Sequence, residues 1–315
     1  MPVEPSEAVW IETTAPLRTA LVGLIDAFPS ERQRPEANSA AMREFDSEAD
    51  WLSPNPEHEE WGTPIQTADT LSRLQLQLAF DCARALEHLI TETEPPYVYS
   101  PAAMLRPILE GAARSRYLTQ PGLAIKERVR RSMNERIDSL YWTKMRVPEA
   151  REYAKERLEH IWAAAELLGF VVLKSAKSRP RYLDPGRPSH GNVIKRLYQS
   201  HGDDQGLAQA LILTADSISH AGSLGLVSYI SRVEQPDGLL SLEDNTAVVR
   251  MTVKQADILL SAALLTISIS GSSMMQYQGW PSQAWLEKAQ IGNKAIADVM
   301  GDVKRQLGDP PAIGK

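Results

Sequence analysis

The sequence predicts a mainly α protein: a single compact multi-helix domain with one small β-hairpin insertion and an irregular acidic N-terminal arm. Three observations predict this class. Residue types that favour helices, such as leucine, alanine, glutamate and arginine, are plentiful. Apolar residues recur every three or four positions over several long segments, and proline and glycine stand where these segments begin and end. With 315 residues, 43% of them hydrophobic, the chain can bury a sizeable core.

Residues 1–63 are predicted to form the acidic arm, with one short amphipathic helix over residues 15–28. The first 60 residues carry 13 acidic and 4 basic side chains. Residues 29–63 are rich in proline, glutamate, asparagine and serine, a composition typical of a long loop or a wrapping arm. We therefore expect the helical domain to comprise residues 64–315.

The helical domain is predicted to begin with a long helix from Thr63-Pro64 to about Ile90. Ser100 caps the next helix, and Pro101 fits its first turn. The same periodicity predicts further helices over residues 123–145, 148–169, 191–200, 207–230, 253–277 and 283–306.

Two segments near the end of the chain have other properties. Residues 239–252 alternate well enough to predict a small β-hairpin that turns at Asp244-Asn245. The helix over residues 253–277 is the most apolar, but polar residues interrupt it. We expect it to be a buried core helix and not a membrane span, and no membrane partner is predicted.

Composition and missing motifs exclude several classes of site. The single cysteine, Cys82, excludes an intrachain disulfide and a cysteine-based zinc cluster. It favours a reducing, cytoplasmic location, and the first residues lack the features of a signal peptide. The sequence contains no glycine-rich phosphate loop, HExxH motif or nucleophile elbow, so neither a cofactor nor a metal is predicted.

Charge is unevenly distributed along the chain. The net charge is −6, yet residues 106–136 carry 8 basic and 3 acidic side chains, and residues 174–196 carry 7 basic side chains and one acidic. Two interpretations stay open. The basic segments hold an anion locally, or the acidic arm folds over them and neutralises them.

A charged stripe is predicted on the helix that starts at Ser100. Arg106, Glu110, Arg114 and Tyr117 lie three or four residues apart and share one narrow helix face, opposite an apolar face. Either this stripe lies in water, or it lines a charged pocket with a guanidinium able to bind a phosphate or carboxylate.

A second candidate lies on the helix over residues 207–230, which is rich in small residues. Asp216 and His220 are four residues apart, so the carboxylate can fix the imidazole tautomer and raise its basicity. Ser219 stands beside them. The histidine is either a satisfied core residue, or it faces the Arg106/Glu110 stripe and forms one polar site with it.

The third candidate is Arg196 and His201, with four residues between them. This spacing matches the loose signature of the HEPN ribonucleases. There the arginine would orient a phosphate, and the histidine would act in acid–base chemistry on the ribose 2′-hydroxyl. Alternatively, His201 caps the end of its helix.

A wider resemblance joins these segments. LRPILEGAARSRYL, RVRRSMNERIDSLY, PSHGNVIKRLY and SISHAGSLGL together resemble a group of uncharacterised bacterial helical proteins that look like distant relatives of the HEPN superfamily. The resemblance spans about residues 70–280 and implies a helical fold. Arg106, Glu110, Ser219 and His220 are the positions that its pattern carries. The chain departs from the HEPN nuclease signature at Leu197, where a polar residue is usual.

The leading hypothesis for function is a polar pocket that binds a small anionic ligand or a nucleic-acid phosphate. Arg196 would also contact the anion, and His220 would pair with Glu110 as the polarising pair. This hypothesis requires Arg106 and His220 to converge. The predicted ligand-binding residues are Arg106, Arg114, Tyr117, Asp216 and Ser219.

Two further hypotheses stay open. One is a metal-independent ribonuclease of a toxin or phage-defence system, which uses Arg196 and His201 and requires them to meet in an accessible cleft. The other is a structural or partner-binding scaffold without catalysis. A homo-oligomer, most simply a homodimer, is predicted, and RNA is a possible partner.

Overall fold

The computed structural model describes residues 7–29, 33–52, 63–91, 99–174, 180–202, 206–219 and 251–307. These residues form ten α-helices, a short 3₁₀ turn at Pro148–Ala150 and no β-strand. The predicted mainly α class is therefore confirmed. The predicted hairpin lies almost wholly outside the described residues, because only Met251 and Thr252 of it are among them.

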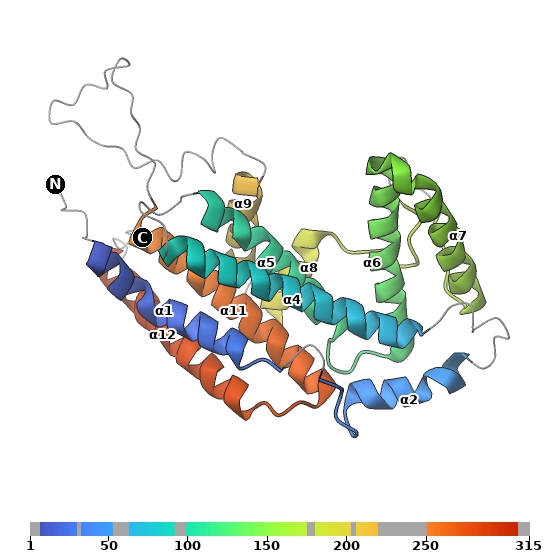
Figure 1. Ribbon diagram of the computed structural model, residues 1–315, viewed down its shortest axis with the longest axis horizontal. Coiled ribbons are helices and arrows are strands. Elements are labelled where there is room, and N and C mark those ends of the chain that lie inside the picture. Colours follow the sequence, from blue (N-terminus) through green and yellow to red (C-terminus); the bar gives the residue numbers. More distant parts are fainter. Residues whose placement is uncertain are drawn as a thin grey trace, which may run out of the picture.

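Five long helices build the main apolar core. They are α1 (Glu7–Asp26), α4 (Pro64–Thr91), α5 (Tyr99–Leu118), α11 (Val253–Gln278) and α12 (Gln283–Leu307). Figure 1 shows α4 and α5 side by side, with α11 against them and α1 and α12 on the outer side of α11. The α4–α5 packing is close at Gly111, where a Cβ atom would stand 2.6 Å from the backbone oxygen of Gln75. This contact requires glycine.

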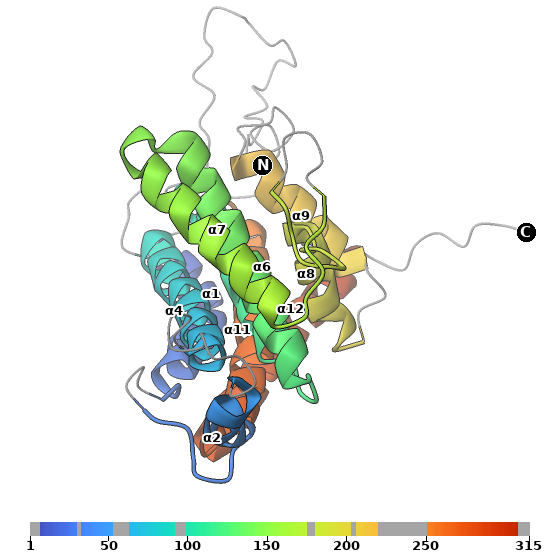
Figure 2. The same ribbon diagram turned by 90° about the vertical axis from the view of Figure 1, so that its right-hand side faces the viewer.

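Four more helices pack around α5 and the end of α4. α8 (His190–Gln199) and α9 (Gly206–Ser219) pack directly on it. α6 (Ile125–Arg146) and α7 (Arg151–Leu167) pair with each other and stand at the end of α4 (Figures 1 and 2). A second apolar cluster lies here, with Ile65, Val129, Ile137, Leu158 and Phe170 among its members.

The prediction of an irregular N-terminal arm is wrong in two respects. Residues 40–52 form a helix, α2 (Ala40–Leu52), and Ser39 Oγ accepts a hydrogen bond from the backbone N–H of Met42 at its start. α1 begins at Glu7, and Leu17 and Leu21 are fully buried in the main core. The sequence suggested a loop because α2 is stabilised by contacts with distant helices, which local composition does not reveal.

The predicted core position of the most apolar helix is confirmed. α11 starts with a capping box in which Thr252 and Gln255 satisfy each other's backbone N–H groups. In the part of the chain that the structure describes, it is the one helix long and apolar enough to cross a membrane. However, 78% of its apolar stretch is buried inside the protein, so its apolarity serves the core.

A carboxylate buried in the first turns of α11 gives a test of pH dependence. Burial raises the pKa of Asp257 to about 6 from the ordinary 3.8. Because the folded protein holds this proton more tightly than the unfolded chain, the carboxyl stabilises the fold most below its unfolded pKa. That stability is lost as the pH rises through the folded value.

We expect Asp257→Asn to stabilise the protein at neutral pH. The gain in the free energy of unfolding should grow by about 2 kcal/mol between about pH 4.5 and about pH 7.5, because asparagine cannot ionise. Urea denaturation at both pH values measures it. A gain that does not change with pH would show that the ionisation of Asp257 is not the cause.

Candidate functional site

The charged stripe on α5 is largely covered. The side chains of Arg106 and Glu110 are 27% and 21% exposed, whereas Arg114 and Tyr117 are buried. α6, α8 and α9 all contact α5, and between them they cover its polar face. The inner half of the stripe, Arg114 and Tyr117, is therefore buried, whereas its outer half, Arg106 and Glu110, is partly exposed.

The outer end of the stripe joins residues from three helices in what we call the Glu110 cluster: Arg106, Glu110, His190 and Asp216. Arg106 Nε donates to Glu110 Oε1 over 2.8 Å, and Arg106 Nη1 lies 2.9 Å from Asp216 Oδ1. On the other side, His190 Nδ1 lies 2.6 Å from Glu110 Oε2, although these two atoms are not aligned as a hydrogen bond. The side chains of His190 and Asp216 are 43% and 49% exposed, so the cluster opens to solvent.

The two basic neighbours keep Glu110 ionised. Burial by itself would raise the pKa of Glu110, but the close contact and charge of His190, together with Arg106, lower that pKa below its ordinary value. Glu110 is therefore a fixed negative charge between a guanidinium and an imidazole.

Behind this cluster lies a buried ion network, which we call the Glu135 network. Glu135 on α6 pairs with Arg114 and also accepts from Arg187 Nε and Nη2, both at 3.1 Å. Arg187 Nη1 lies 3.4 Å from Asp138 Oδ2, and Asp138 accepts a hydrogen bond from the Tyr182 hydroxyl. The side chains of Glu135, Arg114 and Arg187 are each no more than 8% exposed.

Arg114 connects the two groups. Burial lowers the pKa of its guanidinium, and the carboxylates of Glu135 and Glu110 oppose that effect. Its Nη2 atom is buried, and no residue that the structure describes accepts a hydrogen bond from it. A buried guanidinium with an unused donor adds positive potential to the inner wall of the cluster.

The segment before α8 positions Arg187 and His190. Leu183 is fully buried, and its backbone is held by Asn134 on α6, whose amide accepts at 2.7 Å and donates at 3.1 Å. Ser189 then caps α8 by accepting from the Asn192 N–H. His190 is therefore the first residue of a capped helix, with a defined backbone direction.

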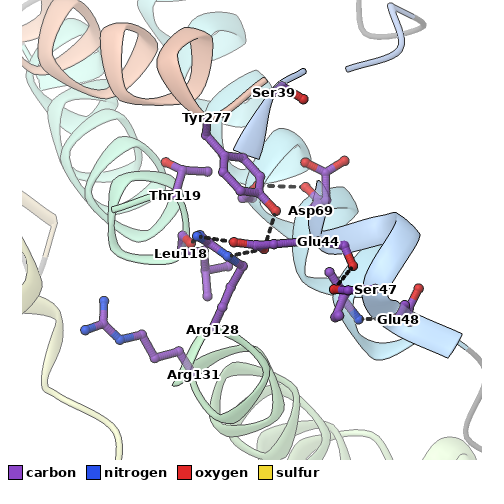
Figure 3. A network of polar contacts seen from close by, with 12 residues as sticks. Ser39, Glu44, Ser47, Glu48, Asp69, Leu118, Thr119, Arg128, Arg131 and Tyr277 are labelled. Carbon is purple, nitrogen blue, oxygen red and sulfur yellow. Dashed lines mark hydrogen bonds and ion pairs between the residues drawn. The ribbon is translucent and has the colours of Figure 1, made fainter. Parts of the chain in front are cut away.

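A separate polar network connects α2 to α6 and α11 (Figure 3). Arg128 on α6 donates to both carboxylate oxygens of Glu44, at 2.8 and 3.1 Å, and to the backbone oxygen of Leu118. Tyr277 donates to Glu44 over 2.9 Å, and its ring lies 4.2 Å below the guanidinium. A groove of about 930 Å³ lies beside this network, lined by α2, the α5–α6 turn and the end of α11.

The structure brings together some of the predicted site residues. Arg106, Glu110 and Asp216 meet, and Arg114 lies behind them. Tyr117 does not join them, because Arg131 of α6 covers its ring at 4.1 Å. Ser219 ends α9, and His220 lies outside the described residues.

Arg196 and His201 make no direct polar contact with each other in the part of the chain that is described. Arg196 is exposed on α8, and no hydrogen bond or ion pair links it to His201. His201 follows the end of that helix, where its Nδ1 lies 3.1 Å from Ser200 Oγ. Burial, followed by the charge of Arg116, lowers the pKa of His201. The charge that lowers this pKa thus belongs to a residue of α5 and not to Arg196.

Sequence reasoning missed His190, Glu135 and Arg187. The sequence does contain a signal for Glu135. In the helix over residues 125–146, charged residues also stand between the apolar positions, and there are more of them than one solvated face can hold. No comparable signal marks Arg187 and His190, since their positions depend on how the segment before α8 folds onto α6.

Within the described ranges, no group of three or more histidine, cysteine, aspartate or glutamate side chains is placed to hold a metal ion. Comparisons of the chain with protein-family models, with curated proteins and with solved structures give no match. The functional argument therefore rests on the geometry of the Glu110 cluster.

Proposed function

We propose that the Glu110 cluster binds a small anionic ligand or a nucleic-acid phosphate, with Arg106 as its main contact. One observation carries this proposal. Arg106 stands at the boundary between a buried ion network and solvent, where Asp216, one of the two carboxylates that pair with it among the described residues, is half exposed. The other partner, Glu110, holds the guanidinium in place.

An incoming anion would exchange with Asp216. Exposed ion pairs contribute only about 0.2–1 kcal/mol, because water solvates both charges well. A phosphate or carboxylate that accepts two parallel hydrogen bonds from a guanidinium is held more strongly. Asp216 is thus a replaceable partner, and its release leaves the inner contact between Arg106 and Glu110 intact.

The inner wall of the cluster favours the same ligand class. Arg114 lies behind Glu110 and contributes a positive charge in a poorly solvated region. Charge interactions are stronger there than at the surface. Its pairing with Glu135 fixes the guanidinium without giving its Nη2 atom an acceptor among the described residues.

Variants of Arg106 and Asp216 should change anion binding in opposite directions. Arg106→Gln should weaken the binding of inorganic phosphate by about 10-fold or more, because it removes a charged hydrogen-bond donor. Asp216→Asn should tighten binding by a few-fold, about the worth of an exposed pair. Isothermal titration calorimetry with inorganic phosphate, a mononucleotide and a short oligoribonucleotide measures both effects.

A surface pair provides the control. Arg84 and Asp26 form an ion pair whose side chains are 52% and 57% exposed, so Arg84→Gln should leave anion binding unchanged. If Arg106→Gln binds phosphate as the unmodified protein does, the proposal is wrong. If no anion binds at all, a structural or partner-binding role is favoured instead. The HEPN relationship, the homodimer and the cytoplasmic location stay predictions from the sequence.

A further inference from the structure

We infer that His190 is the proton-transfer group of this site and that the bound anion is a phosphate ester, whose P–O bond the site cleaves. The inference rests on the proposed anion binding at Arg106. It assigns phosphate-ester cleavage to this site and names a base, His190, that the sequence did not indicate. Glu110 acts in this scheme as a positioning residue.

The contact between Glu110 and His190 sets the state of the imidazole. A carboxylate oxygen 2.6 Å from Nδ1 would be repelled if that nitrogen carried only a lone pair. The negative charge of Glu110 therefore favours the neutral tautomer with its proton on Nδ1. Nε2, on the opposite side of the ring, then keeps its lone pair and can accept a proton. Because the side chain is 43% exposed, a ligand or water molecule can reach it.

The imidazole is also held in position before any ligand arrives. Ser189 fixes the start of α8, and three residues upstream of His190 the guanidinium of Arg187 is tied to Glu135. A base whose backbone is held in this way meets the requirement that catalytic groups be placed before the reaction begins.

The proposed reaction uses His190 and Arg106. A water molecule gives a proton to Nε2 of His190 while its oxygen forms a bond to phosphorus. The ester P–O bond breaks, and the leaving oxygen takes a proton from the imidazolium, which returns His190 to its neutral form. Arg106 neutralises the charge that develops on a non-bridging oxygen of phosphorus. The products are an alcohol and a phosphate with one ester bond fewer.

The tautomer of His190 provides the first test. Long-range ¹H–¹⁵N spectra of the full chain resolve ring nitrogens, and His190→Asn assigns the signal among the six histidines. We expect the neutral His190 ring to carry its proton on Nδ1, and we expect Glu110→Gln to remove this preference. A proton on Nε2 in the unmodified protein would overturn the inference.

Addition of inorganic phosphate to the same sample separates this inference from the proposed function. Shifts at both Arg106 and the His190 ring support both. Shifts at Arg106 alone leave anion binding standing and overturn the role of His190. No shift at either residue contradicts the phosphate-binding proposal itself.

Hydrolysis of bis(4-nitrophenyl) phosphate and 4-nitrophenyl phosphate provides the second test, and distinguishes diester from monoester substrates. His190→Gln should lower the hydrolysis rate by about 100-fold, the usual contribution of a general base. His160, an exposed residue of α7, is the control, and His160→Gln should keep the full rate. If the unmodified protein binds phosphate but hydrolyses neither ester, the cleavage step is wrong.

Discussion

Replacing Glu135 with glutamine is expected to lower the free energy of unfolding by about 3–5 kcal/mol. Glu135 is the shared partner of Arg114 and Arg187, and all three side chains are almost completely buried. The variant keeps the shape of the residue but leaves two buried guanidiniums facing a neutral amide. Urea denaturation, followed by the helical circular dichroism signal at about 222 nm, measures the loss.

Asp26→Asn is the matched control for this prediction. It also removes a carboxylate from an arginine, yet Asp26 and Arg84 are more than half exposed. Its effect should stay below about 1 kcal/mol. Similar losses for the two variants would show that the Glu135 network is solvated and contributes no more than a surface pair.

A triple variant separates charge pairing from packing. Arg114→Met, Glu135→Leu and Arg187→Met together remove these three buried charges while retaining much of the volume, and Asp138 keeps its hydrogen bond from Tyr182. Buried ion networks replaced in this way often regain or exceed the original stability. We therefore expect the triple variant to be more stable than Glu135→Gln alone, although the inner positive charge proposed for anion binding would be lost.

The sequence predicts the long helices better than it predicts their surroundings. α4, α5 and α11 carry their signals locally: α4 and α5 have apolar periodicity and a proline in the first turn, and α11 is strongly apolar and follows the capping residue Thr252. α2 has a capping residue, Ser39, but it lies in a segment whose composition is typical of a loop, and its ion pair between Glu44 and Arg128 joins positions 84 residues apart. Tertiary contacts of this kind override local composition.

The candidate site was predictable in the same partial way. The spacing of Arg106 and Glu110 predicted a polar stripe, and one of two open interpretations placed it against the helix that carries Asp216; the structure joins these three residues. The sequence assigned the imidazole of the site to His220, which lies outside the described residues. It gave no reason to choose His190, because helical periodicity does not predict the path of the proline-containing segment before α8, which positions this residue.

Glu44→Gln is the second change expected to have a large effect. Arg128 is only 3% exposed and forms its one ion pair among the described residues with Glu44, while the charge of Asp69 acts on it more weakly. Loss of this charge leaves a buried guanidinium paired with an amide and a backbone oxygen. We expect the free energy of unfolding to fall by about 3 kcal/mol or more, and urea denaturation measures the fall.

Glu48→Gln, one turn later on α2, distinguishes charge from contact. Glu48 is equally buried, at 4% exposed, but its partners are neutral: it accepts from the backbone N–H of Ile65 and from the Gln66 side chain. Burial raises its pKa, with these hydrogen bonds opposing, so its charge is already costly. A glutamine keeps one acceptor oxygen, and the loss should stay within about 1 kcal/mol.

Hydrogen exchange locates the effect of both variants. If the ion pair with Arg128 holds α2 in place, Glu44→Gln should speed amide exchange in α2 while leaving exchange in α4 and α5 unchanged, because segments with few remaining contacts open locally. Equal exchange in the two variants would mean that α2 is held by apolar packing, through residues such as Ala41, which is fully buried. In that case the network in Figure 3 would set the orientation of α2 without being the source of its stability.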